Sequence, residues 1–235
     1  MPNVRRGMQA DQAAGLRSKH IRPRAQTVSL FVTQPGFALR LAHALQARHG
    51  RVLLIDSAGR HALAAKTQSI FAWEQQVARQ RLQTISIQGV DVLHAPDVLG
   101  GEAAIVQAGA AYDYVLFDGH HLQSERVALD PRTSQTFIVE VSAQPQATCN
   151  AYALLKTLHQ HKLDGRVFLW GDPAGCERVI SATHFFLQAH LGLWEVLSGE
   201  GDAHLAALAA KISAAEISTN RLLDKNTGGE CAQYG

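Results

Sequence analysis

Residues 28–56 read VSLFVTQPGFALRLAHALQARHGRVLLID, and this stretch decides the fold. An apolar run of buried-strand length opens it at 28–33, and a second one closes it at 51–56. Between them, residues 37–49 repeat apolar side chains at helical spacing. A buried strand, a helix and another buried strand are typical of the first β-α-β unit of a nucleotide-binding α/β domain.

The connection between the first strand and the helix is very short. Only Gln34, Pro35 and Gly36 separate Thr33 from Phe37. A phosphate-binding loop at this place needs about eight residues, among them glycines whose N–H groups converge on the phosphates, a Lys, and a Ser or Thr for the metal ion. Pro35 has no N–H, and neither a Lys nor a hydroxyl residue follows the turn. We therefore expect a nucleotide-binding scaffold that has lost its catalytic loop.

Composition favours a cytoplasmic globular protein. The chain has 235 residues, 46% of them hydrophobic, and a net charge of +2 that is too small to predict direct nucleic-acid binding. It has no apolar run of roughly 18 residues, as a membrane-spanning helix needs. No apolar segment follows the charged start, as a secretory signal would require. Its three widely spaced cysteines fit a reducing compartment.

Strand-like and helix-like segments alternate along the chain. The expected strands are 28–33, 51–56, 90–94, 113–118, 135–142, 166–170 and 193–197. The expected helices are 37–49, 60–82, 101–111, 146–162, 174–190 and 203–216. This order predicts an α/β domain over 27–217, with a mainly parallel, twisted sheet of about seven strands flanked by helices. A basic leader, 1–26, with a helical pattern at 8–19 precedes the domain, and 218–235 reads as a flexible tail.

The carboxyl ends of the parallel strands are where ligands bind in such sheets, and Thr33, Asp56 and Asp118 end three of the expected strands. With nucleotide bound, the two Asp side chains would organise a metal ion. Without it they would be strand-end carboxylates that cap neighbouring helices, which is the interpretation we adopt. Asp118 also lies close in sequence to His120 and His121, but neighbouring residues usually point in different directions, so we predict no metal site.

Three segments resemble the MinD/ParA-type ATPases. Residues 51–56 are similar to the family's second strand, which ends in an Asp near the nucleotide. Residues 112–119 (YDYVLFDG) resemble its Walker B strand, and residues 139–156 resemble the strand, Pro turn and helix that follow. The resemblance covers about 27–200 and implies a P-loop NTPase-like fold. In that family, nucleotide between two subunits drives dimerisation and membrane attachment, and the missing loop removes the basis for expecting these properties here.

The leader carries the most specific match. Residues 11–17 (DQAAGLR) are similar to the DQAxxLR segment of the flagellar-number regulators FlhG, also called FleN, within that family. The resemblance implies a helix that docks on FlhF, a signal-recognition-type GTPase, and stimulates GTP hydrolysis. A helix of two turns is marginal alone in water, so we expect it to order on its partner. The predicted contact residues are Asp11, Gln12, Ala13, Leu16 and Arg17.

The last expected helix, 203–216, is amphipathic. Leu205, Leu208, Ala209 and Ile212 share one face. In FlhG proteins a C-terminal amphipathic helix binds the membrane, but a surface-binding helix normally carries a basic face, and this one does not. We expect it to pack against the domain, with membrane contact at most peripheral.

These features predict a non-catalytic, FlhG-like regulator of flagellar number or placement that reaches a cell pole through its partner. By resemblance, further partners would be flagellar switch components or a flagellar transcription activator. The alternative is an ATP-binding ATPase with an atypical site, in which Asp56 and Asp118 hold Mg²⁺ and Arg40 or a partner residue compensates for the missing Lys. In a third interpretation the leader match is accidental and the protein serves another polar or envelope machine. Homodimer formation stays open.

Overall fold

The computed structural model describes residues 25–56, 60–61, 75, 78–79, 83–94, 109–118, 135–160, 165–187, 194–197 and 201–227. Its strands are β1 (Gln26–Phe31), β2 (Val52–Asp56), β3 (Ile85–Ile87), β4 (Val90–His94), β5 (Tyr114–Asp118), β6 (Gln135–Val141), β7 (Gly165–Gly171) and β8 (Trp194–Leu197). Its helices are α2 (Phe37–Gln46), α5 (Pro145–Gln160), α6 (Pro173–Leu187) and α7 (Asp202–Thr227).

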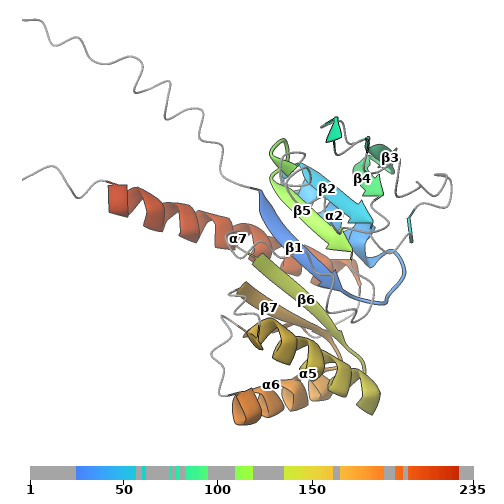
Figure 1. Ribbon diagram of the computed structural model, residues 1–235, viewed down its shortest axis with the longest axis vertical. Helices are drawn as coiled ribbons and strands as arrows, with labels where there is room; N and C mark the ends of the chain where they lie inside the picture. Colours follow the sequence, from blue (N-terminus) through green and yellow to red (C-terminus); the bar gives the residue numbers. More distant parts are fainter. Residues whose placement is uncertain are drawn as a thin grey trace, which may run out of the picture.

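The strands form a single sheet in the order β3-β4-β2-β5-β1-β6-β7-β8 (Figure 1). All pairs are parallel except β3 with β4, which form an antiparallel hairpin at one edge. The predicted α/β fold with a mainly parallel sheet is therefore confirmed, and each of the seven expected strands is present. The eighth, β3, is short and was not expected.

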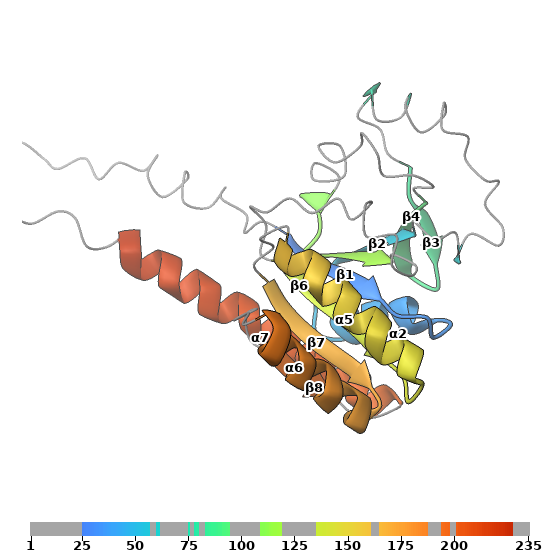
Figure 2. The ribbon, with the colours of Figure 1, turned by 60° about the horizontal axis from the view of Figure 1, so that its bottom comes forward.

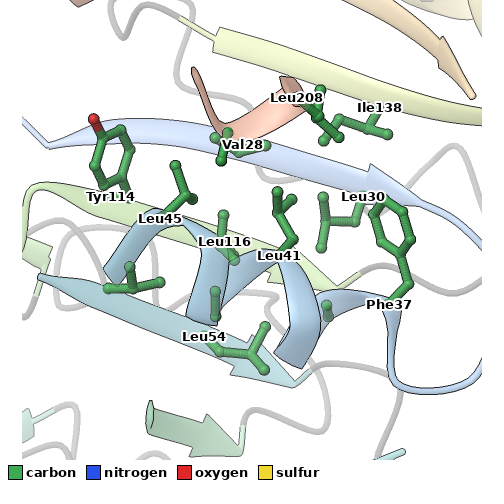
Figure 3. Packing of buried hydrophobic residues seen from close by; sticks show 14 of the residues in the cluster. Val28, Leu30, Phe37, Leu41, Leu45, Leu54, Tyr114, Leu116, Ile138 and Leu208 are labelled. Atoms are coloured by element: carbon green, nitrogen blue, oxygen red, sulfur yellow. The ribbon is translucent and has the colours of Figure 1, made fainter. Parts of the chain in front are cut away.

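Helices α2 and α7 cover one face of the sheet. Leu41 and Leu45 of α2 pack on Val28 of β1 and Leu116 of β5 in one buried cluster, which Leu208 of α7 joins (Figure 3). Helix α7 contributes the four apolar residues expected on one face, and all four are buried in this cluster: Leu205, Leu208, Ala209 and Ile212. The prediction that this helix packs against the domain is confirmed.

Helices α5 and α6 cover the opposite face of the sheet, over β6 and β7 (Figure 2). Leu154, Leu155 and Leu158 of α5 belong to a second buried cluster. It also contains Val179 of α6 and three residues of β6: Phe137, Val139 and Val141. Side chains of a strand alternate between the two faces, so Ile138 of β6 belongs to the first cluster instead. The core is thus divided between the two faces of one sheet, as a doubly covered parallel sheet requires.

Several expected segments differ from the observed bounds or lie outside the described residues. The leader helix 8–19, most of 60–82 and most of 101–111 lie outside the described part of the chain. Helix α7 runs to Thr227, past the expected end at 216 and into the segment expected to be a tail. Within the described residues, no helix is both long and apolar enough to span a bilayer.

Candidate functional site

Three neighbouring strands end in side chains that carry charge or can gain it. In the parallel register, Asp56 at the end of β2 lies beside Asp118 at the end of β5 and beside His94 at the end of β4. Both carboxylates are almost fully buried, with 0% and 1% of their residue surface exposed. Buried carboxylates need partners, because removing a charge from water is costly. The short segment after β2 supplies those partners.

Arg60 is the cation at this edge of the sheet. Its guanidinium forms an ion pair with Oδ1 of Asp118 and donates to the carbonyl oxygens of Val32 (3.0 Å) and Thr33 (3.4 Å), just after β1. Its backbone N–H donates to Oδ1 of Asp56 at 2.9 Å. Arg60 therefore links the ends of β1, β2 and β5. Its side chain is only 23% exposed. Breaking such a buried pair costs several kcal/mol, about 3–5 in general.

Two imidazoles complete the group, which we call the strand-end cluster: Asp56, Arg60, His61, His94 and Asp118. His61 donates its backbone N–H to Oδ2 of Asp56 (3.0 Å), and its Nε2 lies 2.9 Å from Oδ2 of Asp118. His94 places Nδ1 3.6 Å from Oδ2 of Asp56, which is too long for a hydrogen bond. Neither ring nitrogen of His94 has a hydrogen-bond partner among the described residues, although both are buried.

Oxygen and nitrogen atoms in this cluster are close enough to hold a metal ion. One ligand atom each from Asp56, His61 and Asp118 lie within 4.8 Å of one another. Asp56 was expected to cap a neighbouring helix. It accepts the backbone N–H groups of Arg60 and His61 in the bend that follows β2. Asp118 pairs with side chains instead. His120 and His121 lie outside the described residues, so the pairing of Asp118 with them stays untested.

The turn between β1 and α2 is fixed at both of its ends. The N–H of Phe37 donates to the carbonyl of Gln34 (3.2 Å), and Gly36 adopts a left-handed conformation (φ 71°) as the N-cap. The ring of Phe37 is buried and meets Trp170 edge to face, with centroids 5.2 Å apart. Because Phe37 is buried in the core, the helix starts immediately after Gly36 and the turn stays three residues long.

Thr33 is held on the other side of the turn by Glu140 of β6. Both its N–H and its hydroxyl donate to Oε2 of Glu140, each at 2.5 Å. Beside this pair lies a pocket of about 430 Å³ between the ends of β1 and β6 and helix α5. Phe31 and Leu154 are among its apolar lining residues, and Gln144 is among its polar ones. The carboxyl edge of β1 thus separates this pocket from the strand-end cluster.

The prediction of a degenerate nucleotide site rests on the sequence of the turn at Gln34, Pro35 and Gly36. This turn contains no Lys, Ser or Thr, the residue types that supply the ammonium and hydroxyl groups of a triphosphate-binding loop. The guanidinium of Arg60 bonds the carbonyls of Val32 and Thr33, where such a loop would begin.

In the ATP-binding alternative, Arg40 or a partner residue would replace the missing Lys, and the structure places Arg40 elsewhere. Its guanidinium lies 4.0 Å from Asp202 at the start of α7. The cation beside Asp118 is instead Arg60, which the sequence reasoning did not single out. His61, His94 and Glu140 were also missed. His94 ends an expected strand, as Asp56 and Asp118 do, and this was the signal that could have identified it.

The predicted partner-binding residues, Asp11 to Arg17, lie outside the described residues. Their role stays a prediction. The other predicted positions divide into two groups: Asp56 and Asp118 come together in the strand-end cluster, and Gln34, Pro35 and Gly36 form the adjacent turn.

Solved structures show what this architecture is similar to. The cell division ATPase MinD of Pyrococcus furiosus aligns with a TM-score of 0.54 and 15% identity, over 81% of this chain and 99% of that one. A MinC:MinD cell division complex from Aquifex aeolicus aligns with a TM-score of 0.50 and 15% identity, over 90% of this chain and 99% of that one. A plasmid partition protein from Borrelia burgdorferi aligns with a TM-score of 0.50 and 12% identity, over 83% of this chain and 99% of that one.

No protein-family model and no curated protein sequence matches the chain. The similarity to these solved structures is therefore one of architecture. Sequence identities of 12–15% show a shared fold and no shared function. The chain has the fold of the MinD/ParA-type ATPases, and the P-loop NTPase-like class expected from its sequence is confirmed.

Proposed function

We propose that this protein is a non-catalytic, FlhG-like regulator that uses a MinD/ParA-type fold as a scaffold and acts by binding other proteins. The observation that carries the first half of this proposal is the position of Arg60. Its guanidinium pairs with Asp118 and bonds the backbone just after β1, so a side chain provides the positive charge at this edge of the sheet. Phosphoryl transfer needs cations and amides aimed at the phosphates, and the three-residue turn provides neither.

The second half of the proposal rests on the leader. Residues 11–17 (DQAAGLR) match the segment with which FlhG proteins engage the GTPase FlhF. The leader joins the domain directly before β1, as a peptide that docks on a partner could. In this proposal Asp11 and Gln12 set groups in the partner's GTPase site, Ala13 and Leu16 supply the apolar contact, and Arg17 makes charged hydrogen bonds.

The test is GTP hydrolysis by a purified FlhF-type GTPase in the presence of the full-length chain. The parent is expected to raise the rate, and the double variant Asp11→Ala/Gln12→Ala is expected to leave it at the basal value. A matched control, Gln9→Ala/Lys19→Ala, changes two polar residues of the same leader outside the matched segment. If the Asp11/Gln12 variant stimulates as well as the parent does, the proposed mechanism is wrong.

The rival function is nucleotide binding at an atypical site, because two acids do lie at the strand ends where this fold binds ligands. Calorimetry with ATP and Mg²⁺ separates the two. We expect no binding in the micromolar range. Micromolar binding that Asp118→Asn weakens would support the ATP-binding alternative instead. The result for the leader does not depend on this measurement, so each half of the proposal can fail separately.

A further inference from the structure

The geometry points to a second property of the strand-end cluster, which does not depend on the proposed partner binding. We propose that Asp56, His61, His94 and Asp118 bind a divalent transition-metal ion, of which Zn²⁺ is the typical example, without any nucleotide. Two imidazole nitrogens and two carboxylate oxygens form a mixed donor set that Zn²⁺ and similar ions favour, whereas Mg²⁺ prefers oxygen ligands alone.

The spacing of the donor atoms fits such an ion. Two ligands that each lie about 2.1 Å from a tetrahedral ion are roughly 3.4 Å apart. Nε2 of His61 lies 2.9 Å from Oδ2 of Asp118, and Nδ1 of His94 lies 3.6 Å from Oδ2 of Asp56. These two pairs bracket the ideal spacing. Ligand atoms of Asp56, His61 and Asp118 lie within 4.8 Å of one another, so small side-chain rotations would bring them around one centre. His94 does not belong to this group of three, so its ring would also have to turn toward that centre to supply the fourth ligand.

His94 supplies an independent observation that a ligand is expected here. Its side chain is 11% exposed, and neither ring nitrogen has a hydrogen-bond partner. A buried polar group without a partner is unfavourable by about 1–3 kcal/mol. Coordination of a metal ion by Nδ1 would give one of these two buried nitrogens a partner. Among the described residues, no other His, Cys, Asp and Glu side chains form a group that could hold a metal ion.

The remaining atoms of the two carboxylates are already oriented. Oδ1 of Asp118 pairs with Arg60, and Oδ1 of Asp56 accepts the N–H of Arg60 at 2.9 Å. Each carboxylate therefore keeps its Oδ2 turned toward an imidazole. Outer contacts of this kind fix the ligands of metal sites and typically change metal affinity by 10- to 100-fold when they are removed. In this arrangement Arg60 holds the two carboxylates in place and does not itself bind the ion.

The first experiment uses Co²⁺ as a spectroscopic substitute for Zn²⁺ on the full-length chain after treatment with a chelator. The parent is expected to bind about one Co²⁺ with visible d–d absorption, and Zn²⁺ is expected to displace it. His61→Gln and His94→Gln are each expected to weaken binding at least about tenfold. The control is His159→Gln, an exposed histidine near the end of α5.

The proposal is overturned if His61→Gln and His94→Gln bind Co²⁺ as the parent does, or if the parent shows no Co²⁺ bands. It is also overturned if Mg²⁺ competes as well as Zn²⁺, because that outcome would indicate a site made of carboxylates. Should a variant unfold in circular dichroism, X-ray absorption of the Zn²⁺-loaded parent decides. Coordination of the Zn²⁺ ion by two imidazoles supports the site, and coordination without any imidazole refutes it.

Discussion

Arg60 occupies an unusual position for an arginine, since it holds two buried carboxylates and the backbone after β1 at once. We predict that Arg60→Gln lowers the free energy of unfolding by about 3 kcal/mol, because the buried carboxylate of Asp118 would lose its ion pair with the guanidinium. The value is taken at the low end of the general range, since part of the guanidinium is exposed. Urea denaturation followed by circular dichroism measures the change.

The control for this prediction is Arg79→Gln, which alters an exposed arginine. Surface substitutions usually change stability by less than about 0.5 kcal/mol. An equal loss in both variants would mean that the ion pair with Asp118 adds nothing to stability.

Cys176 and Cys149 offer a second test at the scale of single residues. Burial, and to a lesser extent the charge of Asp172, raise the pKa of the Cys176 thiol to about 11. Cys149 is exposed. Because only the thiolate reacts, we predict that at about pH 8 a thiol reagent modifies Cys149 rapidly and Cys176 only after unfolding.

This measurement uses a Cys231→Ser background, so that the two thiols are counted separately by mass spectrometry. The sign follows from the raised pKa: the thiolate fraction of native Cys176 grows only as the pH approaches 11. Rapid modification of Cys176 in the native protein at about pH 8 would contradict its burial.

The residues at the strand ends differ in how far the sequence could identify them. Asp56 and Asp118 were identified because each ends an apolar run, and the parallel sheet then brought them together. Arg60 and His61 stand at the start of the segment expected to be a helix, 60–82, and a helical pattern does not indicate that their side chains contact the ends of neighbouring strands. Glu140 was missed because it occurs within a strand, and only the register between β1 and β6 sets it beside Thr33.

Among the elements, α7 shows the most direct link between pattern and packing. Leu208 is fully buried between α7 and α2. We predict that Leu208→Ala lowers the free energy of unfolding by about 3 kcal/mol, through lost apolar burial and the cavity left behind. Thermal or urea unfolding measures this loss.

The matched control is Ala207→Ser, an exposed neighbour on the same helix, for which we expect a change within about 0.5 kcal/mol. If Leu208→Ala were as mild as Ala207→Ser, α7 would not be part of the cooperative core.

The helices and strands themselves were largely predictable, because long apolar runs and helical periods are strong local signals. Strand β3 was not, since it has three residues and its Ile85 is exposed. Its hairpin with β4 depends on Gln88 and Gly89, both with positive φ (52° and 82°), as the tightest hairpin turns require. A glutamine at the first of these positions is a weak turn signal.

At the scale of the whole molecule, the proposed loss of nucleotide binding bears on assembly. We predict that the molar mass in solution, measured by light scattering after size exclusion, is the same with and without ATP and Mg²⁺. The prediction follows from the proposal, since the three residues between Thr33 and Phe37 include no Lys, Ser or Thr to hold a nucleotide between two copies. A shift toward twice the mass on adding ATP would contradict this. A dimer present in both conditions would not, because it would be independent of nucleotide.

The direction of β1 has a practical consequence for handling this protein. Gln26 opens the strand at the amino edge of the sheet, and Asp56, Asp118 and His94 close their strands at the opposite edge. A six-residue strand extends about 20 Å. An attachment through the leader would therefore enter the folded domain at the amino end of β1, the end opposite the acidic strand ends.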